Sequence, residues 1–335
     1  MRIQKQLMHS LLIIGCGSIG ERHLRCFQST GRCQVSVCDA NATLLAAVSD
    51  RYQVRDYPNL ETAIGDRKFD AWVICTPAHT HLSIARKGAE EGAALFIEKP
   101  LAVSLDEVES TRLAIRQSGR FTAVAYVYHC FPWVMAARDF LLTGALGKPL
   151  HATVVAGQHF PTFRPAYREI YYTRHETGGG AIQDALTHLA NAMEWMLGPI
   201  TRVFCDASHQ QLEGVTVEDT VNIVARHGDV LVSYAMNQFQ APNETTVWIH
   251  CEHGSLKIES HAQRWGVLKR GESDWTWHTS KPLERDDLFI AQANAFLDGM
   301  EGRNCGLCSF EEAVQTLRFN RAALESTATG TAMTL

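Results

Sequence analysis

Short apolar segments alternate with segments of helical periodicity over residues 11–127. Apolar runs separated by amphipathic helices are typical of a parallel sheet with helices on both faces, so we expect a doubly wound α/β domain here. The predicted strands cover residues 11–14, 35–39, 71–75, 94–97 and 121–127, and the predicted helices cover 19–29, 41–51, 79–91 and 104–118.

The pattern changes after residue 127, where long strand candidates follow one another without helices between them. Such a succession indicates an antiparallel or mixed sheet, and therefore an α+β domain. We predict two domains, at residues 1–127 and 128–335, in keeping with a length of 335 residues. The later strands are predicted at 150–156, 201–208, 220–226, 230–238, 245–251 and 255–259, and the later helices at 133–142, 181–197, 286–300 and 309–326.

The composition is that of an ordinary globular protein, with 46% hydrophobic and 20% charged residues. A net charge of -5 gives no basic field for a nucleic acid, which argues against nucleic acid as a partner. No apolar stretch approaches the roughly 18 to 20 residues of a membrane span. The apolar run at residues 11–14 is also shorter than the roughly 7 to 15 apolar residues of a signal peptide. We therefore expect a soluble, cytoplasmic protein with no membrane partner.

Ten cysteines and 15 histidines invite a metal or redox interpretation. The only CxxC, Cys305-Gly-Leu-Cys308, lacks a second ligand pair at a suitable spacing. Ser309 and Glu312 beside it form a capping box for the last helix, and Ser104 and Glu107 form a similar box earlier. We expect buried free thiols in a reducing compartment and no metal site.

A glycine-rich motif, Gly15-Cys-Gly17-Ser18-Ile19-Gly20, lies between the first predicted strand and the next helix. The first two glycines allow a tight turn and a close approach of backbone N–H groups to a pyrophosphate, and the third lets the helix pack on the strand. The start of the helix, at Ser18 and Ile19, stabilises the anion. The motif therefore predicts a dinucleotide site.

Asp39 ends the second predicted strand, 19 residues after Gly20. A carboxylate there accepts hydrogen bonds from ribose hydroxyls and repels a 2′-phosphate, so NAD is favoured over NADP. The alternative is an acidic residue at a strand end with no ligand. The complete context of strand, loop, helix and strand favours NAD binding.

Three further segments stand in an order and spacing that carry a resemblance. Cys75-Thr76-Pro77-Ala-His-Thr-His81 and Glu98-Lys99-Pro100 each follow a predicted strand, and Gly178-Gly-Gly180-Ala-Ile-Gln-Asp184-Ala-Leu-Thr-His188 opens a helix of the second domain. Together they resemble the glucose-fructose oxidoreductase / inositol dehydrogenase family, written Gfo/Idh/MocA. The resemblance covers nearly the whole chain, including Val217-Glu-Asp219-Thr.

The resemblance implies a Rossmann domain and an α+β domain whose large, open, mostly antiparallel sheet builds a homodimer or homotetramer. It implies hydride transfer between a nicotinamide and a sugar, polyol or related hydroxyl compound. It also implies that Lys99, Asp184 and His188 form the catalytic group and contact the substrate. The implied cofactor contacts outside the glycine motif are Cys75, Thr76, Pro77, His81, Glu98 and Lys99.

The same three residues suit the oxidation of an alcohol, which needs a base for the hydroxyl proton while hydride leaves carbon. An imidazole such as His188 titrates in the right range. Lys99, kept extended by Pro100, lies just beyond a strand end and can stabilise negative charge on the substrate oxygen. Asp184 can orient the substrate or the base. The alternatives are a lysine that reaches into water and a solvated helix face.

Helical spacing separates the residues over 181–197 into two groups. We expect the first group to form an apolar stripe and the second to form a polar face with a tryptophan, which favours a site over a solvated surface. The first group is Ile182, Leu186, Leu189 and Met193, and the second is Asp184, His188, Asn191 and Trp195.

The chain departs from the family at Tyr126-Val-Tyr-His129-Cys, where many relatives have a Tyr-x-x-Arg-Phe pattern. Tyr126 is still expected to contact the substrate. His129 replaces the arginine, which puts in doubt any anion contact at that position.

An aromatic and basic stretch at residues 158–176 is the candidate substrate loop. Aromatic faces suit sugar rings, and arginines suit a carboxylate or phosphate, so an acidic or nucleotide-linked sugar is one hypothesis. Arg168 and Tyr172 are the expected contacts. The alternative is that these residues tie the loop to the sheet or to a neighbouring subunit. The loop carries His159, Arg164, Tyr167, Arg168, Tyr171, Tyr172 and Arg174.

The favoured function is an NAD-dependent dehydrogenase that acts on a carbohydrate. An NAD-dependent glycosidase, which oxidises its substrate transiently and eliminates the aglycone, is a second hypothesis. A catalytically silent dinucleotide sensor is a third, disfavoured because Lys99, Asp184 and His188 are all present.

Overall fold

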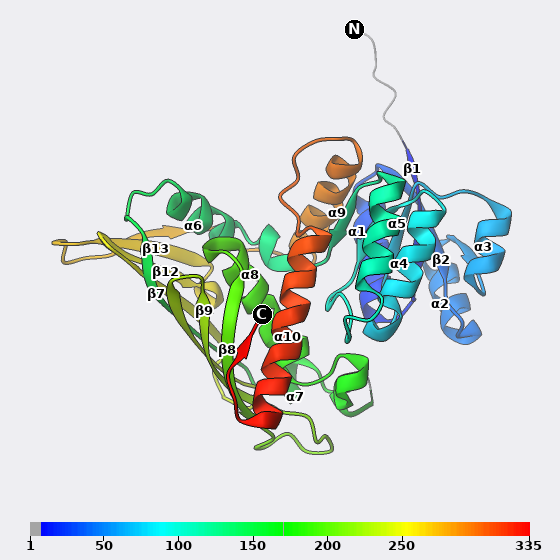
Figure 1. Ribbon diagram of the computed structural model, residues 1–335. Helices are drawn as coiled ribbons and strands as arrows, with labels where there is room; N and C mark the ends of the chain where they lie inside the picture. Colours follow the sequence, from blue (N-terminus) through cyan, green and yellow to red (C-terminus); the bar gives the residue numbers. More distant parts are fainter. Residues whose placement is uncertain (1–7, 170) are drawn as a thin grey trace, which may run out of the picture. The chain divides into compact units, whose positions relative to one another are not determined.

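Two sheets organise the chain, a parallel one in a first unit and a mixed one in a second (Figure 1). The computed structural model describes residues 8–169 and 171–335. The first unit runs to Val127 and takes in Leu283–Phe310, and the second comprises Tyr128–Pro282 and Glu311–Leu335. The predicted fold class, a doubly wound parallel sheet followed by an α+β region, is confirmed.

The six strands of the first sheet lie in the order β3-β2-β1-β4-β5-β6, and every neighbouring pair is parallel. The strand order reverses between β1 and β4, and ligands bind at such a reversal in open parallel sheets. β4 and β5 are buried at every residue, which is why they are continuous apolar runs. The strands are β1 (His9–Ile14), β2 (Cys33–Cys38), β3 (Arg55–Tyr57), β4 (Ala71–Ile74), β5 (Ala94–Ile97) and β6 (Thr122–Val124). The helices beside them are α1 (Ser18–Ser29), α2 (Ala42–Tyr52), α3 (Leu60–Asp66), α4 (His81–Glu90) and α5 (Val108–Ser118).

Two elements of this unit were not predicted, and one helix start was wrong. The edge strand β3 is short and mostly exposed, and α3 is a short helix capped by Asn59, whose side chain accepts the N–H of Thr62. The capping box expected at Ser104 does not form. α5 begins only at Val108, after a turn, and no side chain caps its first residues.

The segment Leu283–Phe310 was expected in the second domain but belongs to the first unit. Its helix α9 (Asp287–Met300) places Phe296 in the core of this unit, with ring centroids 5.1 Å from Phe96. Just before the helix, Asp286 accepts two hydrogen bonds from Arg25, at 2.6 and 2.8 Å. Apolar burial and this bidentate pair explain why the chain returns to the first unit.

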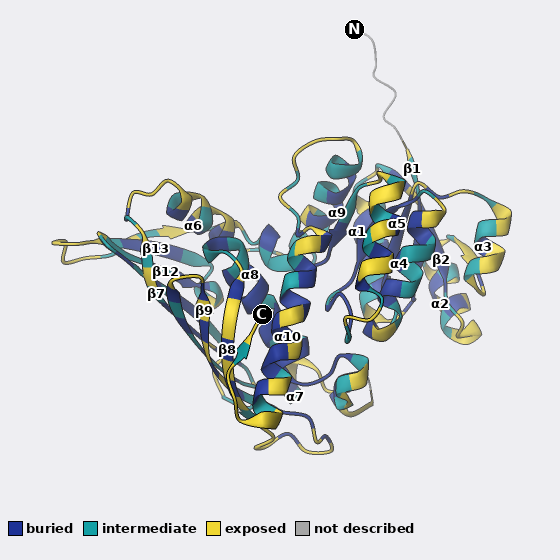
Figure 2. Ribbon diagram, in the orientation of Figure 1, coloured by how far each residue is buried: buried dark blue, intermediate teal, exposed yellow. Residues whose placement is uncertain are grey.

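The second sheet has nine strands in the order β14-β13-β12-β11-β7-β10-β9-β8-β15. Only β7 and β10 pair in parallel among the described strands of this sheet. Residues alternate between buried and exposed along β9, and between buried and half-buried along β10, because one face packs on helices and the other lies open (Figure 2). The strands are β7 (Pro149–Gly157), β8 (Ile200–Ser208), β9 (Thr220–His227), β10 (Val230–Asn237), β11 (Glu244–Cys251), β12 (Gly254–Glu259), β13 (Arg264–Lys269), β14 (Thr276–Thr279) and β15 (Met333–Thr334).

Three helices of ten or more residues accompany this sheet, α6 (Pro132–Leu142), α8 (Thr187–Leu197) and α10 (Phe310–Thr329). All three were predicted, with shifted ends. The strands β13, β14 and β15 were not predicted. β13 mixes charged residues with a tryptophan, β14 is a largely exposed strand of four residues, and β15 has only two residues.

The ten cysteines are free, and all but Cys305 are buried, as expected. Burial raises the pKa of the Cys16 thiol to about 12, so this thiol is unreactive. Within residues 8–169 and 171–335, no helix is long and apolar enough to cross a membrane. The same described residues contain no group of three or more His, Cys, Asp or Glu side chains that could hold a metal ion.

Candidate functional site

The glycine motif forms a tight loop between β1 and α1. Gly15 has a φ of +93°, and a Cβ there would lie 2.7 Å from the carbonyl oxygen of Cys75. A Cβ on Gly20 would lie 1.8 Å from the carbonyl oxygen of Gly15. At Gly17, by contrast, no described heavy atom lies within 4 Å of the position a Cβ would take. The loop is therefore closed toward the protein and open toward a ligand.

The N-terminus of α1 follows this opening. Gly17 is its N-cap residue and supplies no side-chain cap, and Ser18 is exposed. Uncapped N–H groups of a helix start attract anions. Together with the opening at Gly17, they fit the pyrophosphate of a dinucleotide.

Asp39 directly follows β2 and borders the same loop. Its Oδ2 accepts the N–H of Cys16 at 2.7 Å, and its Oδ1 accepts the N–H of Asn41 at 2.7 Å. Asp39 therefore contacts the backbone of the glycine loop directly.

The loop after β4 is fastened by His81. Its Nε2 lies 2.7 Å from the carbonyl oxygen of Thr76, and its Nδ1 lies 3.0 Å from that of Pro100. The side chain is buried, and burial lowers the pKa of its imidazole. His81 therefore links the loops after β4 and β5 and offers no surface to a cofactor, whereas Thr76 and Pro77 in the same loop are partly or fully exposed.

Glu98 and His23 form a buried pair beneath the loop after β5. Oε1 of Glu98 lies 2.6 Å from Nε2 of His23, and Oε2 accepts the N–H of Lys99 at 2.9 Å. Burial opposes ionisation of Glu98, but the hydrogen bond and charge of His23 outweigh it and lower the pKa of the carboxyl. The sequence analysis missed His23. Its position on the buried face of α1, three residues after Gly20, was the available signal.

Lys99 is partly exposed and lies one residue beyond the buried Glu98. It follows β5 at the carboxyl edge of the sheet, the edge that also carries the glycine loop after β1 and the loop after β4. Tyr126, expected to contact the substrate, is fully buried in the structure. The first unit thus brings Lys99 to the edge of the glycine loop and buries Tyr126 in the core.

In the second unit, Asp184 and His188 are partly exposed and lie on one helical segment. The segment opens with a π-turn (Ile182–Leu186) that continues into α8, a feature the sequence did not reveal. The predicted apolar stripe is buried throughout. π-turns recur at functional sites because they change the direction in which side chains point.

Asn191 was expected on the polar face but is buried. Its amide oxygen lies 3.1 Å from Nε2 of His129, and its nitrogen donates to Oγ1 of Thr316 at 3.0 Å. His129 is also buried and stacks on Trp195, with ring centroids 4.1 Å apart. The departure from the family at His129 is therefore part of the packing around α8.

Glu218 fixes the glycine segment that precedes Asp184. Its Oε1 accepts the N–H of Ile182 at 2.9 Å, and its Oε2 lies 2.5 Å from Nε2 of His175. The hydrogen bond to Glu218 raises the pKa of His175 above its usual value. A Cβ on Gly180, at a φ of +89°, would lie 2.5 Å from this carboxylate. The carboxylate therefore packs directly on the turn that presents Asp184.

The candidate substrate loop is held mainly by contacts within its own unit. Tyr172 is fully buried against Phe160 and Tyr167, and its hydroxyl donates to Gln238. Arg168 donates to the backbone oxygen of Glu213 at 2.8 Å and to its carboxylate at 3.1 Å. These two expected substrate contacts anchor the loop instead, because one is core and the other is paired.

Tyr171, next to the buried Tyr172, reaches a candidate catalytic group. Its hydroxyl donates to Oδ1 of Asp184 at 2.8 Å, and the side chain is 43% exposed. The sequence predicts Tyr171 only as one of several aromatic residues of the loop. Nothing in the sequence distinguishes the outward tyrosine from the inward one.

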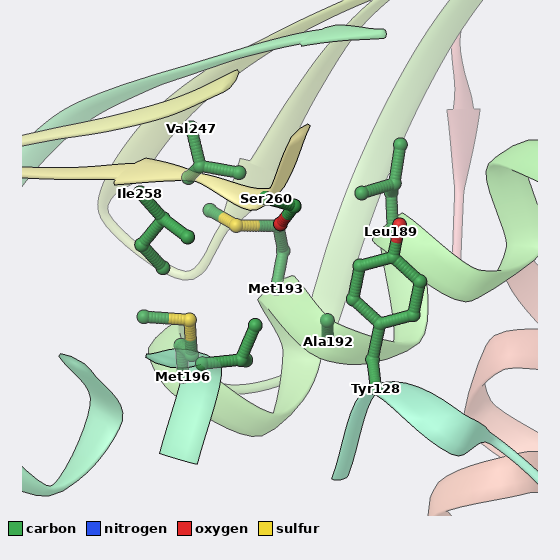
Figure 3. Close-up of a pocket in the computed structure, with 9 residues that line it drawn as sticks. Tyr128, Leu189, Ala192, Met193, Met196, Val247, Ile258 and Ser260 are labelled. Carbon is green, nitrogen blue, oxygen red and sulfur yellow. The ribbon is translucent and has the colours of Figure 1, made fainter. Parts of the chain in front are cut away.

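A small cavity lies between α8 and the sheet of the second unit (Figure 3). Its volume is about 10 Å³, and Met193, Met196, Val247 and Ile258 contribute most of its apolar lining. This space holds one water molecule at most. It is a packing gap in the core and not a substrate site.

Two family models match the chain. "Oxidoreductase family, NAD-binding Rossmann fold" matches residues 10–126, and "GFO/IDH/MocA C-terminal domain" matches residues 134–257. Among characterised proteins, 1,5-anhydro-D-fructose reductase from Ensifer adhaerens is 25% identical over 328 residues, 96% of each chain. Inositol 2-dehydrogenase from Salmonella typhimurium is 27% identical over 191 residues, 55% of this chain and 53% of the relative.

Solved structures show the same fold. Levoglucosan dehydrogenase, in complex with NADH and levoglucosan, has a TM-score of 0.86 at 20% identity, covering 97% of this chain and 99% of the other. The WlbA dehydrogenase from Bordetella pertussis, in complex with NADH and UDP-GlcNAcA, has a TM-score of 0.83 at 21% identity, covering 98% and 99%.

Proposed function

This chain belongs to the Gfo/Idh/MocA family of oxidoreductases with an NAD-binding Rossmann domain, and from that premise we propose that it transfers a hydride between nicotinamide and a hydroxyl-bearing carbon of a sugar, polyol or sugar derivative. The observation that carries the proposal is the edge of the first sheet, where Lys99 follows the buried pair of Glu98 and His23. The opening at Gly17 borders the same edge. The names of relatives support the substrate class, since they include an anhydrofructose reductase, an inositol dehydrogenase and a levoglucosan dehydrogenase.

The glycine loop and Asp39 hold the cofactor in this proposal. Backbone N–H groups at Gly17, Ser18 and Ile19 bind the pyrophosphate. Asp39 accepts hydrogen bonds from the ribose and repels a 2′-phosphate, which makes NAD the preferred cofactor. When bound, the nicotinamide supplies the hydride acceptor.

Lys99, Asp184 and His188 handle the substrate hydroxyl. His188 takes the hydroxyl proton as a general base, because an imidazole is poised to do so near neutral pH. The ammonium of Lys99 stabilises the negative charge that develops on the substrate oxygen. Asp184 accepts a hydrogen bond from the substrate or from the base and so orients it.

The ion pair between Arg168 and Glu213 favours a neutral sugar or polyol over an acidic one as the substrate. Its guanidinium already faces the carboxylate of Glu213, so an acidic substrate would have to displace that carboxylate. Arg164 and Arg174 are exposed on the same loop, and we assign neither of them a contact with a charged group of the substrate.

We also propose that two or more copies of the chain associate through the open face of the second sheet. Three apolar side chains stand exposed on this face, Val155 (40%), Phe204 (44%) and Val224 (50%). Phe204 and Val224 are direct neighbours across β8 and β9. A second copy covering this face would remove them from water.

A panel of sugars, polyols and glycosides, incubated with NAD or NADP and followed at the NADH absorbance, tests the function. We expect net reduction of NAD by at least one polyol or sugar, with weaker use of NADP. Lys99→Ala should abolish the signal, and Lys68→Ala, an exposed lysine of the same unit, should retain it. Cleavage of a glycoside without net NADH would favour the glycosidase. No signal from any compound, unchanged in Lys99→Ala, would favour a dinucleotide sensor.

A further inference from the structure

The hydroxyl of Tyr171 donates a hydrogen bond to Oδ1 of Asp184 at 2.8 Å. Tyr171 opens a short 3-10 turn (Tyr171–Thr173) and is 43% exposed. A hydrogen bond to an ionised carboxylate is stronger than one between neutral groups, and it fixes the rotation of the carboxylate. The contact therefore acts on the charge and the orientation of Asp184.

The backbone that carries Tyr171 is fixed from both sides. On one side, Tyr172 is buried in the cluster of Phe160 and Tyr167. On the other, Oγ1 of Thr177 donates to the carbonyl oxygen of Tyr171 at 2.6 Å. The two consecutive side chains of this 3-10 turn therefore point in different directions. Tyr172 anchors the loop in its core, and Tyr171 points toward Asp184.

The glycine segment before Asp184 is packed directly on this loop. A Cβ on Gly179 would lie 2.1 Å from the carbonyl oxygen of Tyr172, so only glycine permits the approach. The N–H of Gly179 donates to the carbonyl oxygen of Arg174 at 2.8 Å. The amide nitrogen of Gln183 donates to the carbonyl oxygens of His175 and Gly179, at 3.0 and 3.2 Å. The loop and the π-turn are therefore joined by close packing and by backbone and side-chain hydrogen bonds.

We propose that Tyr171 is a positioning residue that holds the Asp184 carboxylate in the orientation required for the reaction. The proposal rests on the proposed function, in which Asp184 orients the substrate or the base. Removal of the phenol hydroxyl leaves the fold of the loop intact, because Tyr172, Thr177 and Gly179 hold it. It takes away the donor to Oδ1, so the carboxylate loses the hydrogen bond that this hydroxyl provides and its pKa rises.

Tyr171→Phe against Tyr167→Phe is the matched comparison. Tyr167 belongs to the same loop, and its hydroxyl donates to the backbone oxygen of Glu213, at 2.7 Å, with no contact to Asp184. In Tyr171→Phe we expect kcat to fall by about tenfold and KM to change less. In Tyr167→Phe both constants should stay at their wild-type values. If both variants share the wild-type kcat, the proposal is overturned.

A titration of the Asp184 carboxyl keeps the test independent of any substrate. Protein labelled with ¹³C at the aspartate carboxyls gives a resonance assigned to Asp184 by its loss in Asp184→Asn. We expect the pKa read from this resonance to rise in Tyr171→Phe and not in Tyr167→Phe, and an unchanged value would refute the proposed contact. The kinetics of Asp184→Asn separate the two proposals. Full activity in Asp184→Asn would refute the role of Asp184 itself. An inactive Asp184→Asn together with wild-type kinetics in Tyr171→Phe would refute only the role of Tyr171.

Discussion

At the scale of single residues, Glu98 links the backbone N–H of Lys99 to His23, which lies 75 positions before Glu98 in the chain. His23 pairs with Glu98 at 2.6 Å, and both side chains are buried. The second oxygen of Glu98 accepts the N–H of Lys99. The pair thus stabilises the first unit and fixes the direction in which Lys99 leaves the sheet.

We predict that His23→Leu destabilises the protein by about 3 kcal/mol, because it leaves a buried carboxylate without its partner. Denaturant unfolding measures this loss. The double variant His23→Leu, Glu98→Gln should recover part of it, since no buried charge then remains. A single variant that unfolds at the wild-type denaturant midpoint would contradict this account of the pair.

Glu194, on α8, gives the second unit a distinct pH dependence. Burial raises the pKa of its carboxyl to about 7, and Oγ1 of Thr316 donates to it at 2.6 Å. The pKa in the folded state lies above the unfolded value, so the stabilisation present below about pH 4.5 is lost as pH rises through about 7.

Glu194→Gln removes this titration. We predict that the stability of the wild type relative to Glu194→Gln falls by up to about 3 kcal/mol between pH 4.5 and pH 8, measured by denaturant unfolding. Glu325→Gln, at an exposed position of α10, serves as the control. A constant difference between wild type and Glu194→Gln across this range would show that Glu194 does not titrate as described.

The chemistry at single positions could be predicted from the sequence only where a motif fixed it. The glycine loop and Asp39 were predicted because their roles follow from neighbouring residues and a strand end. Tyr172 was misplaced because adjacent tyrosines point in opposite directions, and the turn that decides between them is set by packing on Gly179. His23 was missed because its partner, Glu98, lies on a different element.

At the scale of elements, a glycine segment and a π-turn present Asp184. Glu218 accepts the N–H of Ile182 and pairs with His175, and its carboxylate occupies the space beside Gly180. The hydrogen bond to Glu218 raises the pKa of His175, so the stabilisation from this contact is lost as pH rises through that raised pKa. The start of the helical segment is therefore held by the carboxylate of Glu218 and not by the side chain of its own N-cap residue, Ala181.

We predict that Gly180→Ala lowers kcat/KM at least tenfold and leaves NADH binding intact, because its Cβ would push Glu218 away from the turn. Gly228→Ala is a matched control, with a positive φ of 58° and no described atom within 4 Å of the added Cβ. Both variants bear the backbone cost of a positive φ, roughly 1 to 2 kcal/mol. Equal activity in the two variants would refute the proposed role of Glu218 in holding the turn that presents Asp184.

Elements were predictable where burial imposed a pattern. The central strands β4 and β5 are apolar throughout because helices cover both faces. The edge strands β3 and β14 escaped prediction, because they are largely exposed and carry no such pattern. The π-turn could not be predicted, since it arises from contacts with Glu218 and the loop before it and not from helical periodicity.

At the scale of the whole molecule, each unit has its own sheet and core, and the chain visits the first unit twice. The return of Leu283–Phe310 could not be predicted from composition, because no linker marks it. The open face of the second sheet, with Phe204 and Val224 exposed, is the surface that we propose to join two copies.

We predict that Val224→Lys lowers the mass measured by light scattering after size exclusion, because a charge beside Phe204 on the open face opposes burial of this face. Leu113→Lys, at an exposed position of α5 in the first unit, should leave the mass unchanged. An oligomer that survives Val224→Lys at the wild-type mass would contradict association through this face.

The central claim is that the enzyme moves hydride from a substrate carbon to NAD. The most direct measurement uses the best compound of the carbohydrate panel, deuterated at its hydroxyl-bearing carbons, and determines the mass of the nicotinamide product. We predict one deuterium in the NADH formed by the wild type, and no product from Lys99→Ala. Turnover of the compound with no deuterium in the nicotinamide would contradict the account.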